Sequence, residues 1–175
     1  FGQYRYALLC EDENTNDALY WYTQAAEAGF ARAQNNLALL HMSQGNEEQA
    51  LHWYLKAASS NNAFSQYNLA RLYERKGNKQ KALHWYQQAA QNGHERAQNT
   101  VAIKLENSKK KANAFTLYQR AAYSGFKAAQ FNLGLMYENQ ATPDHDIDHK
   151  DMARFWYALA AEQDHTKAQQ RLQKL

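Results

Sequence analysis

The chain repeats one residue pattern five times, and this repetition constrains the fold more than any other feature of the sequence. Five tyrosines, each preceded by Trp or Leu, are spaced 32, 32, 32 and 39 residues apart: Tyr22, Tyr54, Tyr86, Tyr118 and Tyr157. Three and four residues after each tyrosine stand two alanines, and twelve residues after it stands a glutamine. A register kept at several offsets predicts a repeat protein, in which each copy is one supersecondary unit.

Each copy contains two stretches whose apolar residues recur at helical spacing. Between Ala82 and Ala90, the residues at 82, 83, 86, 89 and 90 fall on one helix face, and Val101 and Leu105 belong to a second stripe after Gly93. We therefore expect helices over residues 2–10, 16–28, 31–43, 47–59, 63–76, 79–91, 95–106, 109–123, 127–138, 151–163 and 166–174.

The segments between these helices carry turn and capping signals. Seven residues after each repeated tyrosine stands a turn residue: Gly29, Asn61, Gly93, Gly125 and Asp164. The three glycines are expected in a left-handed conformation that ends a helix. Asn46 and Asn78 are expected to cap the helices that follow them.

A helix pair of this size cannot bury both of its faces alone and must stack on the next pair. The connections are short, except at residues 139–150, so neighbouring helices are expected to be antiparallel. The alanine pairs suit close helix contacts. The sequence thus predicts an all-α fold, a right-handed α/α superhelix (solenoid) of about five and a half helix-turn-helix repeats in a single domain, 1–175. Because Phe1 begins within a repeat, we expect a leader or a further repeat to have preceded it.

Two segments resemble the Sel-1-like repeat, a relative of the tetratricopeptide repeat: Trp85-Tyr86-x-x-Ala89-Ala90-x-x-Gly93 and Ala129-Gln130-Phe131-Asn132-Leu133-Gly134-x-Met136-Tyr137. The chain departs from the family where Tyr73 to Asn78 runs almost straight into the next helix, so three repeats are shortened. Its lone Cys10 excludes the subgroup with a disulfide in every repeat. The resemblance implies a non-enzymatic adaptor that brings proteins together, and it favours a bacterial periplasmic, envelope or secreted setting over the cytoplasm.

The first helix of each pair is expected to line a concave surface, and the stripe beside the packed one is the candidate partner-binding site. Its arginines would meet carboxylates, its asparagines would bind a partner's backbone, and its aromatic rings would anchor apolar groups. An alternative for the asparagines is hydrogen bonding between repeats. Arg71, Tyr67 and Phe131 vary between copies and are expected to discriminate between partners. The full candidate set is Arg32, Asn35, Asn36, Leu39, Phe64, Tyr67, Asn68, Arg71, Arg96, Asn99, Thr100, Ile103, Phe131, Asn132 and Leu135.

The segment from Asp144 to Asp151 holds carboxylates and imidazoles at spacings that can chelate a metal. His145, Asp146 and His149 are the candidate ligands, and a metal-stabilised regulator using this loop is one alternative function. The segment lacks the Gly and terminal Glu of an EF-hand loop. The favoured interpretation is a solvated loop whose acids stabilise the next helix N-terminus, so no metal or other cofactor is expected.

Other function classes have weak support in the sequence. The chain has a net charge of +3, a mean hydropathy of −0.85 and no apolar run of spanning length, so no membrane insertion is expected. Its one basic run, Lys109-Lys110-Lys111, is expected to open a helix and is too small for a nucleic-acid surface. Without a phosphate loop, a nucleophile elbow or a metalloprotease helix, no enzyme is expected. A structural or oligomerising segment of a larger assembly is the remaining alternative.

Overall fold

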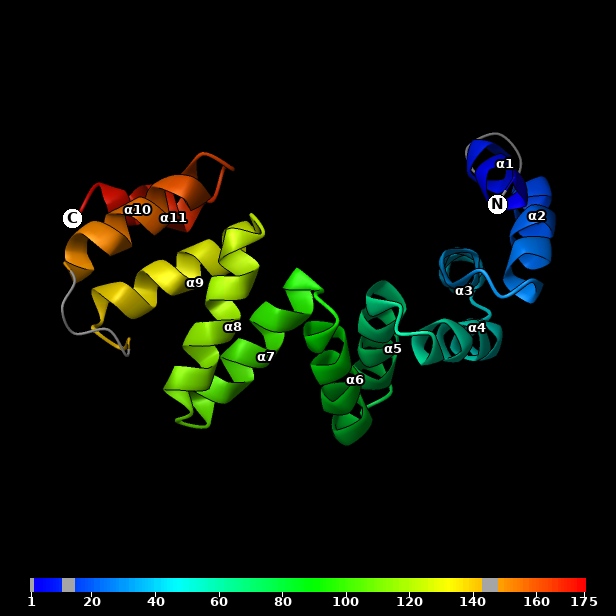
Figure 1. Ribbon diagram of the computed structural model, residues 1–175, viewed down its shortest axis with the longest axis horizontal. Coiled ribbons are helices and arrows are strands. Elements are labelled where there is room, and N and C mark those ends of the chain that lie inside the picture. The colour runs from blue at the N-terminus through cyan, green and yellow to red at the C-terminus, as the bar shows by residue number, and fades with distance from the viewer. Residues whose placement is uncertain (1, 11–14, 143–147) are drawn as a thin grey trace. The chain divides into compact units, whose positions relative to one another are not determined.

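The structure is a computed structural model that describes residues 2–10, 15–142 and 148–175 (Figure 1). These residues form eleven α-helices and no strand. The helices are α1 (Gly2–Cys10), α2 (Thr15–Glu27), α3 (Ala31–Ser43), α4 (Glu47–Ser59), α5 (Ala63–Arg75), α6 (Lys79–Gln91), α7 (Glu95–Asn107), α8 (Lys111–Tyr123), α9 (Lys127–Glu138), α10 (His149–Ala161) and α11 (Thr166–Leu172). None of the described helices is long and apolar enough to cross a membrane.

The helices pack as pairs within two compact units, residues 1–92 and 93–175. In the first unit α1 packs on α2, α3 on α4 and α5 on α6, with α2 against α3 and α4 against α5. In the second unit α7 packs on α8, α9 on α10 and α10 on α11, with α8 against α9. Five pairs and one further helix confirm the predicted all-α repeat fold.

Two helix starts differ by two residues from the sequence prediction. The prediction that Lys109 opens a helix is wrong, because Lys109 has a φ of 61°, which places it in the turn. Helix α8 therefore begins at Lys111, and only the last lysine of the basic run is helical. Helix α10 begins at His149, two residues earlier than predicted, because Asp148 caps it: its Oδ1 accepts hydrogen bonds from the backbone N–H groups of Lys150 (2.9 Å) and Asp151 (3.1 Å).

Helix ends are closed by residues in the left-handed conformation, as predicted. Gly29, Gly93 and Gly125 have φ values of 85°, 93° and 86°. At Gly29, the Gly29 N–H donates to the Ala26 carbonyl (3.0 Å) and the Phe30 N–H donates to the Ala25 carbonyl (3.1 Å), which is a Schellman motif. Asn61 adopts the same conformation without glycine, with a φ of 57°, because its short polar side chain tolerates it.

The capping predictions for the second helices have different outcomes. Asn78 Oδ1 accepts from the Lys81 N–H at 3.0 Å, so the predicted cap of α6 is confirmed. Asn46 stands at the same place before α4 but makes no side-chain cap bond. Its Nδ2 instead donates to Gln44 Oε1 at 3.4 Å, so that prediction is wrong.

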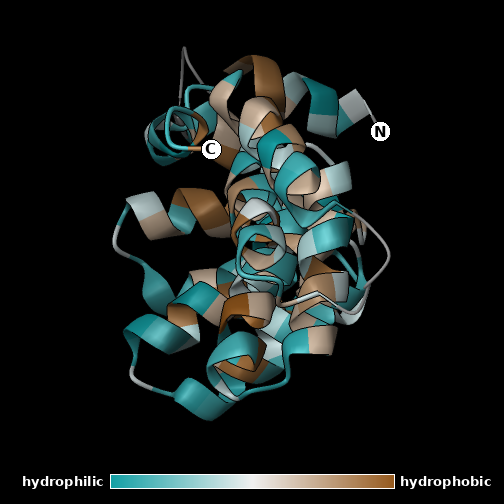
Figure 2. Ribbon diagram, turned by 90° about the vertical axis from the view of Figure 1, so that its left-hand side faces the viewer, coloured by the Kyte–Doolittle hydropathy of each residue, from teal (hydrophilic) through white to brown (hydrophobic). Residues whose placement is uncertain are grey.

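The core of each unit is built on the alanine pairs and the repeated aromatic residues. In α4, Ala57 and Ala58 are buried, together with Tyr54, and in α10 Trp156 and Tyr157 are buried. Figure 2 shows hydrophobic and hydrophilic residues alternating around the helices, as expected when each helix buries one stripe. The alanines remove side-chain volume where two helices meet, so the backbones can approach closely.

The repeated glutamines have a structural role that the sequence pattern did not reveal. Gln66 is 1% exposed, and its Nε2 donates to the Ala58 carbonyl at 3.1 Å. The same bond joins Gln34 to Ala26, Gln130 to Ala122 and Gln169 to Ala161. Each of these carbonyls lies near the end of a helix and already accepts from the N–H of the turn residue, so the glutamine is its second donor. The bond ties the second helix of one pair to the first helix of the next.

Gly134 is expected to resist substitution, although it lies inside a helix. A Cβ built there would lie 2.7 Å from the Tyr157 ring, a buried neighbour with no room to move. We predict that Gly134→Ala lowers the free energy of unfolding by about 1–3 kcal/mol, although Ala favours a helix by about 1 kcal/mol over Gly. Urea denaturation measures the change. Gly2→Ala in α1, where nothing lies within 4 Å, is the matched control and should be neutral or stabilising. Unchanged stability of Gly134→Ala would contradict this packing.

Two histidine caps predict a loss of stability in acid. His94 Nδ1 accepts from the Ala97 N–H and His165 Nδ1 from the Ala168 N–H, each at 3.3 Å. Burial lowers the pKa of both side chains below 6.5. The folded chain thus favours the neutral imidazole, so this stabilisation is complete above about pH 6.5 and is lost as the pH falls below it.

The variant that tests these caps is His94→Asn with His165→Asn, because Asn62 already caps α5 through its Oδ1, which accepts from the Ser65 N–H at 2.9 Å. We expect the free energy of unfolding of this variant to fall less between pH 7 and pH 5 than that of the wild type, by about 1 kcal/mol. Thermal unfolding followed by circular dichroism across this pH range measures the difference. Parallel pH profiles for the two proteins would refute the assignment.

Candidate functional site

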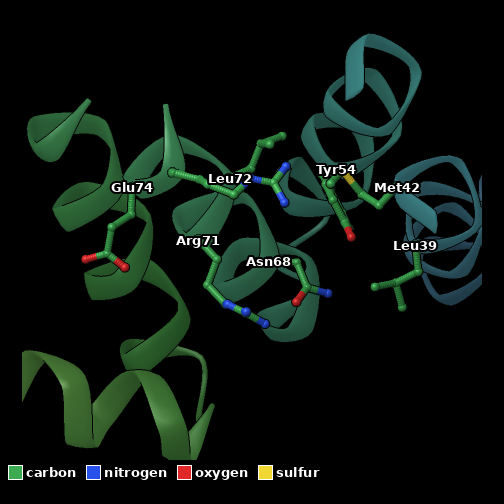
Figure 3. A pocket seen from close by; sticks show the side chains of 8 residues that line it. Leu39, Met42, Tyr54, Asn68, Arg71, Leu72 and Glu74 are labelled. Atoms are coloured by element: carbon green, nitrogen blue, oxygen red, sulfur yellow. The ribbon is translucent and has the colours of Figure 1, made fainter. Parts of the chain in front are cut away.

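A pocket of about 430 Å³ opens between α3 and α5 in the first unit, and α4 contributes one residue to it (Figure 3). Its volume is within the range of small ligand sites. One part of the wall is apolar and the other part carries hydrogen-bond donors and charges. The lining residues are Leu39, Met42, Tyr54, Asn68, Arg71, Leu72, Glu74 and Arg75.

Arg71 is the cation of this pocket that has no charged partner. Its side chain is exposed, and within the described residues its guanidinium makes no hydrogen bond or ion pair. Arg75, one turn later, is already neutralised by Glu47, whose Oε1 lies 2.6 Å from its Nη2. Lys76 also lies 3.3 Å from Glu47. The local positive charge available to a ligand is therefore that of Arg71.

The hydroxyl of Tyr54 is the second polar group without a protein partner in the pocket. The residue is only 3% exposed, yet in the described part of the chain its hydroxyl has no hydrogen bond. Burial raises the pKa of Tyr54 to about 12, and the positive charges of Arg71 and Arg75 act against this rise. In Figure 3 the side chains of Tyr54, Asn68 and Arg71 all point toward the same side of the pocket.

In other repeats, a glutamate accepts a hydrogen bond from the hydroxyl of the equivalent tyrosine. The Tyr86 hydroxyl donates to Glu74 Oε2 at 2.8 Å, and the Tyr118 hydroxyl donates to Glu106 Oε2 at 3.0 Å. Burial and the neighbouring carboxylate both raise the pKa of these two tyrosines. In both cases the glutamate stands twelve residues before the tyrosine. The residue twelve positions before Tyr54 is Met42, so the acceptor is missing there.

The pocket therefore includes residues that the sequence analysis did not select. Tyr54 enters the sequence analysis only as one of the five repeated tyrosines, and Met42 and Glu74 are not among its candidates. The signal that reveals them is the glutamate twelve residues before the repeated tyrosine, together with its replacement in one copy. Of the predicted site residues, Leu39, Asn68 and Arg71 lie in this pocket.

The predicted asparagines take part in links between neighbouring repeats. Asn68 Nδ2 donates to Asn35 Oδ1 at 3.2 Å, and in the second unit Asn132 Nδ2 donates to Asn99 Oδ1 at 2.9 Å. Asn36 Nδ2 donates to the Tyr22 hydroxyl at 3.2 Å. The first two bonds join successive first helices, and the third joins α3 to the second helix of the preceding pair, α2. All three are hydrogen bonds between repeats, the structural role that the sequence analysis allowed for the asparagines.

The other predicted residues lie in separate places. Arg32, Asn35, Asn36 and Phe64 line a second hollow of about 350 Å³ in the first unit. Ile103, Asn99, Phe131 and Asn132 line a hollow of about 550 Å³ in the second unit, beside Lys127 and His165. Arg96 is exposed, Leu135 is half-buried against the core, and Thr100 on α7 is half-buried.

The two predicted aromatic anchors both contact other rings. The Tyr67 ring lies 5.7 Å from the Tyr86 ring, measured between centroids. The Phe131 ring stacks on His165 at 4.6 Å and lies 5.6 Å from Tyr157. Both residues are half-buried, so each offers only part of its ring surface to a partner.

The candidate metal loop is only partly described. His145 and Asp146 lie outside the described residues, whereas Asp148 serves as the cap of α10. His149 Nε2 lies 3.1 Å from the Thr142 hydroxyl oxygen. In the described ranges no group of three or more His, Cys, Asp or Glu side chains is placed to hold a metal ion.

Comparisons with solved structures identify similar folds. The chain is similar to c5321, a protective antigen of uropathogenic Escherichia coli with an SLR fold, at 29% identity and a TM-score of 0.82. It is equally similar to a Sel1 repeat protein from Oxalobacter formigenes, at 28% identity and a TM-score of 0.82. The matches cover 98% and 92% of this chain, but only 40% and 49% of those proteins. YrrB, a TPR protein with an unusual peptide-binding site, shares the fold at 18% identity and a TM-score of 0.54, over 99% of this chain and 91% of that one.

Sequence comparison gives the family. No curated protein matches the chain in sequence. The Sel1 repeat pattern matches residues 1–30, 31–62, 63–94, 107–126 and 127–165, which together make up most of the chain. The segments 31–62 and 63–94 contain the helix pairs α3–α4 and α5–α6, which form the pocket. The chain therefore belongs to the Sel1 repeat family.

Proposed function

We propose that this chain is a non-enzymatic adaptor that binds a protein or peptide partner along the first helices of its repeats. The Sel1 repeat fold is generally a scaffold for protein–protein interaction. The observation that carries the proposal is the pocket between α3 and α5, where unpaired polar groups stand beside apolar side chains. A partner segment that supplied both kinds of group would be bound specifically.

Exposed apolar side chains on the same helices support this assignment. Phe64 on α5 is 61% exposed and Leu39 on α3 is 44% exposed, and each borders a hollow of the first unit. In the second unit, Ile103 on α7 borders the hollow that contains Phe131. Each hollow supplies a modest contact, and several contacts along one partner chain add to a useful affinity because later ones are made within the complex.

The scaffold holds these side chains in fixed positions. The asparagine links and the buried glutamine bonds join successive helices within each unit. A partner therefore does not have to order the surface that it binds, which lowers the entropic cost of association. We expect Arg71 to select among partners by charge, and Tyr67 and Phe131 to contribute through their exposed ring edges.

A displayed library of short random peptides tests this surface. We expect peptides selected on the wild-type chain to lose about tenfold or more in affinity with Leu39→Glu or Phe64→Glu, because each change places a charge in an apolar contact. Leu55→Glu on α4 is the matched control, since Leu55 is similarly exposed but lines none of the pockets described above. Fluorescence anisotropy measures the affinities. Equal losses in all three variants, or none, would refute this choice of surface.

A second candidate function, a segment that oligomerises within a larger assembly, has one observation in its favour. Helix α1 exposes Tyr6, Leu8 and Leu9, the last at 73%. This candidate predicts a dimer in light scattering that dissociates on dilution and is lost in Leu9→Ser, because burial of these side chains would drive the association. A monomer at every concentration would contradict it.

A further inference from the structure

The last complete repeat shows how a tyrosine and an arginine from neighbouring helices bind one glutamate. The Tyr157 hydroxyl of α10 donates to Glu138 Oε2, and Arg171 Nη1 of α11 lies 2.8 Å from Glu138 Oε1. The carboxylate thus joins the second helix of one repeat to the first helix of the next. Both carboxylate oxygens are used. The hydrogen bonds are charge-assisted because the carboxylate and the guanidinium are ionised.

The pocket between α3 and α5 has the donors of this arrangement without the acceptor. Tyr54 on α4 corresponds to Tyr157. Asn68 stands at the position of Arg171 on the following first helix, and Arg71, about one turn later on α5, supplies the cation. Glu74 on α5 and Glu106 on α7 stand twelve residues before the tyrosines of their repeats. Met42 holds the same position relative to Tyr54. A thioether is a poor hydrogen-bond acceptor, so neither the hydroxyl nor the guanidinium is satisfied by Met42.

We propose that this pocket binds the side-chain carboxylate of a glutamate from an acidic partner segment, in place of the glutamate that the repeat lacks. This inference rests on the proposed function and names the chemical group that the pocket selects. The partner carboxylate would accept from the Tyr54 hydroxyl and pair with Arg71. Its methylene groups would contact Leu39, Met42 and Leu72, which form the apolar part of the wall.

The other charges around the pocket are already engaged, so they leave Arg71 to the ligand. Arg75 pairs with Glu47. Glu74, the one carboxylate that lines the pocket, keeps its negative charge while it accepts from the Tyr86 hydroxyl, and in Figure 3 its side chain points away from Arg71. Asn68 donates one amide hydrogen to Asn35 and retains a second N–H. The pocket thus offers three donor groups, one of them cationic, to a single anionic group.

A peptide titration tests the proposal on the intact chain. The probes are an N-acetylated, C-amidated peptide with one glutamate between leucines, the same peptide with glutamine, and the glutamine peptide with a free C-terminal carboxylate. We expect the glutamate peptide to bind about tenfold or more tightly than either other peptide, since a charge-assisted pair is lost in both. Backbone amide NMR shifts should locate the binding at α3 and α5.

Variants assign the effect to the proposed groups. Arg71→Gln and Tyr54→Phe should each weaken binding of the glutamate peptide by about tenfold, and should leave the glutamine peptide unaffected. Met42→Glu should abolish the preference for glutamate, because it restores the acceptor from within the chain. Arg96→Gln, which removes an exposed arginine from another first helix, is the matched control and should change nothing.

The outcomes separate this inference from the proposed function. Equal affinity for the glutamate and glutamine peptides at α3 and α5 would overturn the carboxylate site and leave the surface in place. Restoration of binding by the free C-terminal carboxylate would also overturn it, because the site would then select chain ends. If the library peptides bound the Leu39→Glu and Phe64→Glu variants as tightly as the wild type, the proposed function itself would be overturned.

Discussion

The structure depends on how closely one helix can approach the next, and that distance is set by two alanines in each repeat. Ala57 and Ala58 are buried at the contact, and the carbonyl of Ala58 accepts from the buried Gln66. A larger side chain would force the helices apart and stretch the glutamine bond. The same pair of features recurs in both units, so neighbouring helix pairs within a unit pack on each other in a similar way.

The tyrosine that precedes the alanine pair shows how the loss of one structural contact leaves a polar group without its acceptor. In three repeats its hydroxyl donates to a glutamate of the same helix pair: Glu74, Glu106 or Glu138. In the repeat of α3 and α4, Met42 replaces that glutamate, and the hydroxyl of Tyr54 is directed into a pocket instead. One replacement therefore leaves this hydroxyl without the acceptor that its equivalents have in the described part of the chain.

The helices could be predicted from the sequence because helix formation and pairing depend on the spacing of apolar residues along the chain. Most predicted boundaries were within a residue or two of the observed ones. The misplaced start of α8 arose because Lys109 occupies the left-handed turn position that Gly45 and Gly77 hold in the two preceding repeats. Such a conformation is imposed by the helices on either side of the turn, and propensity at a lysine does not reveal it.

The candidate site was less accessible to sequence reasoning. Spacing identified the helix face that carries Leu39, Asn68 and Arg71, but it did not show that Asn68 binds Asn35 or that the Tyr67 ring packs near Tyr86. These contacts join residues on different helices, and their geometry depends on how the pairs stack. The missing acceptor at Tyr54 becomes evident in the structure, where the equivalent Tyr86 and Tyr118 hydroxyls each donate to a glutamate.

The links between repeats also bear on how such chains gain and lose length. The bonds from Asn68 to Asn35 and from Asn132 to Asn99 each join residues 33 positions apart, one more than the 32-residue repeat. Duplication or deletion of one whole unit inside a connecting turn would bring equivalent side chains back into register, so the flanking contacts would re-form without compensating mutations. Gene rearrangement can thus adjust the number of docking positions while every surviving helix keeps its neighbours.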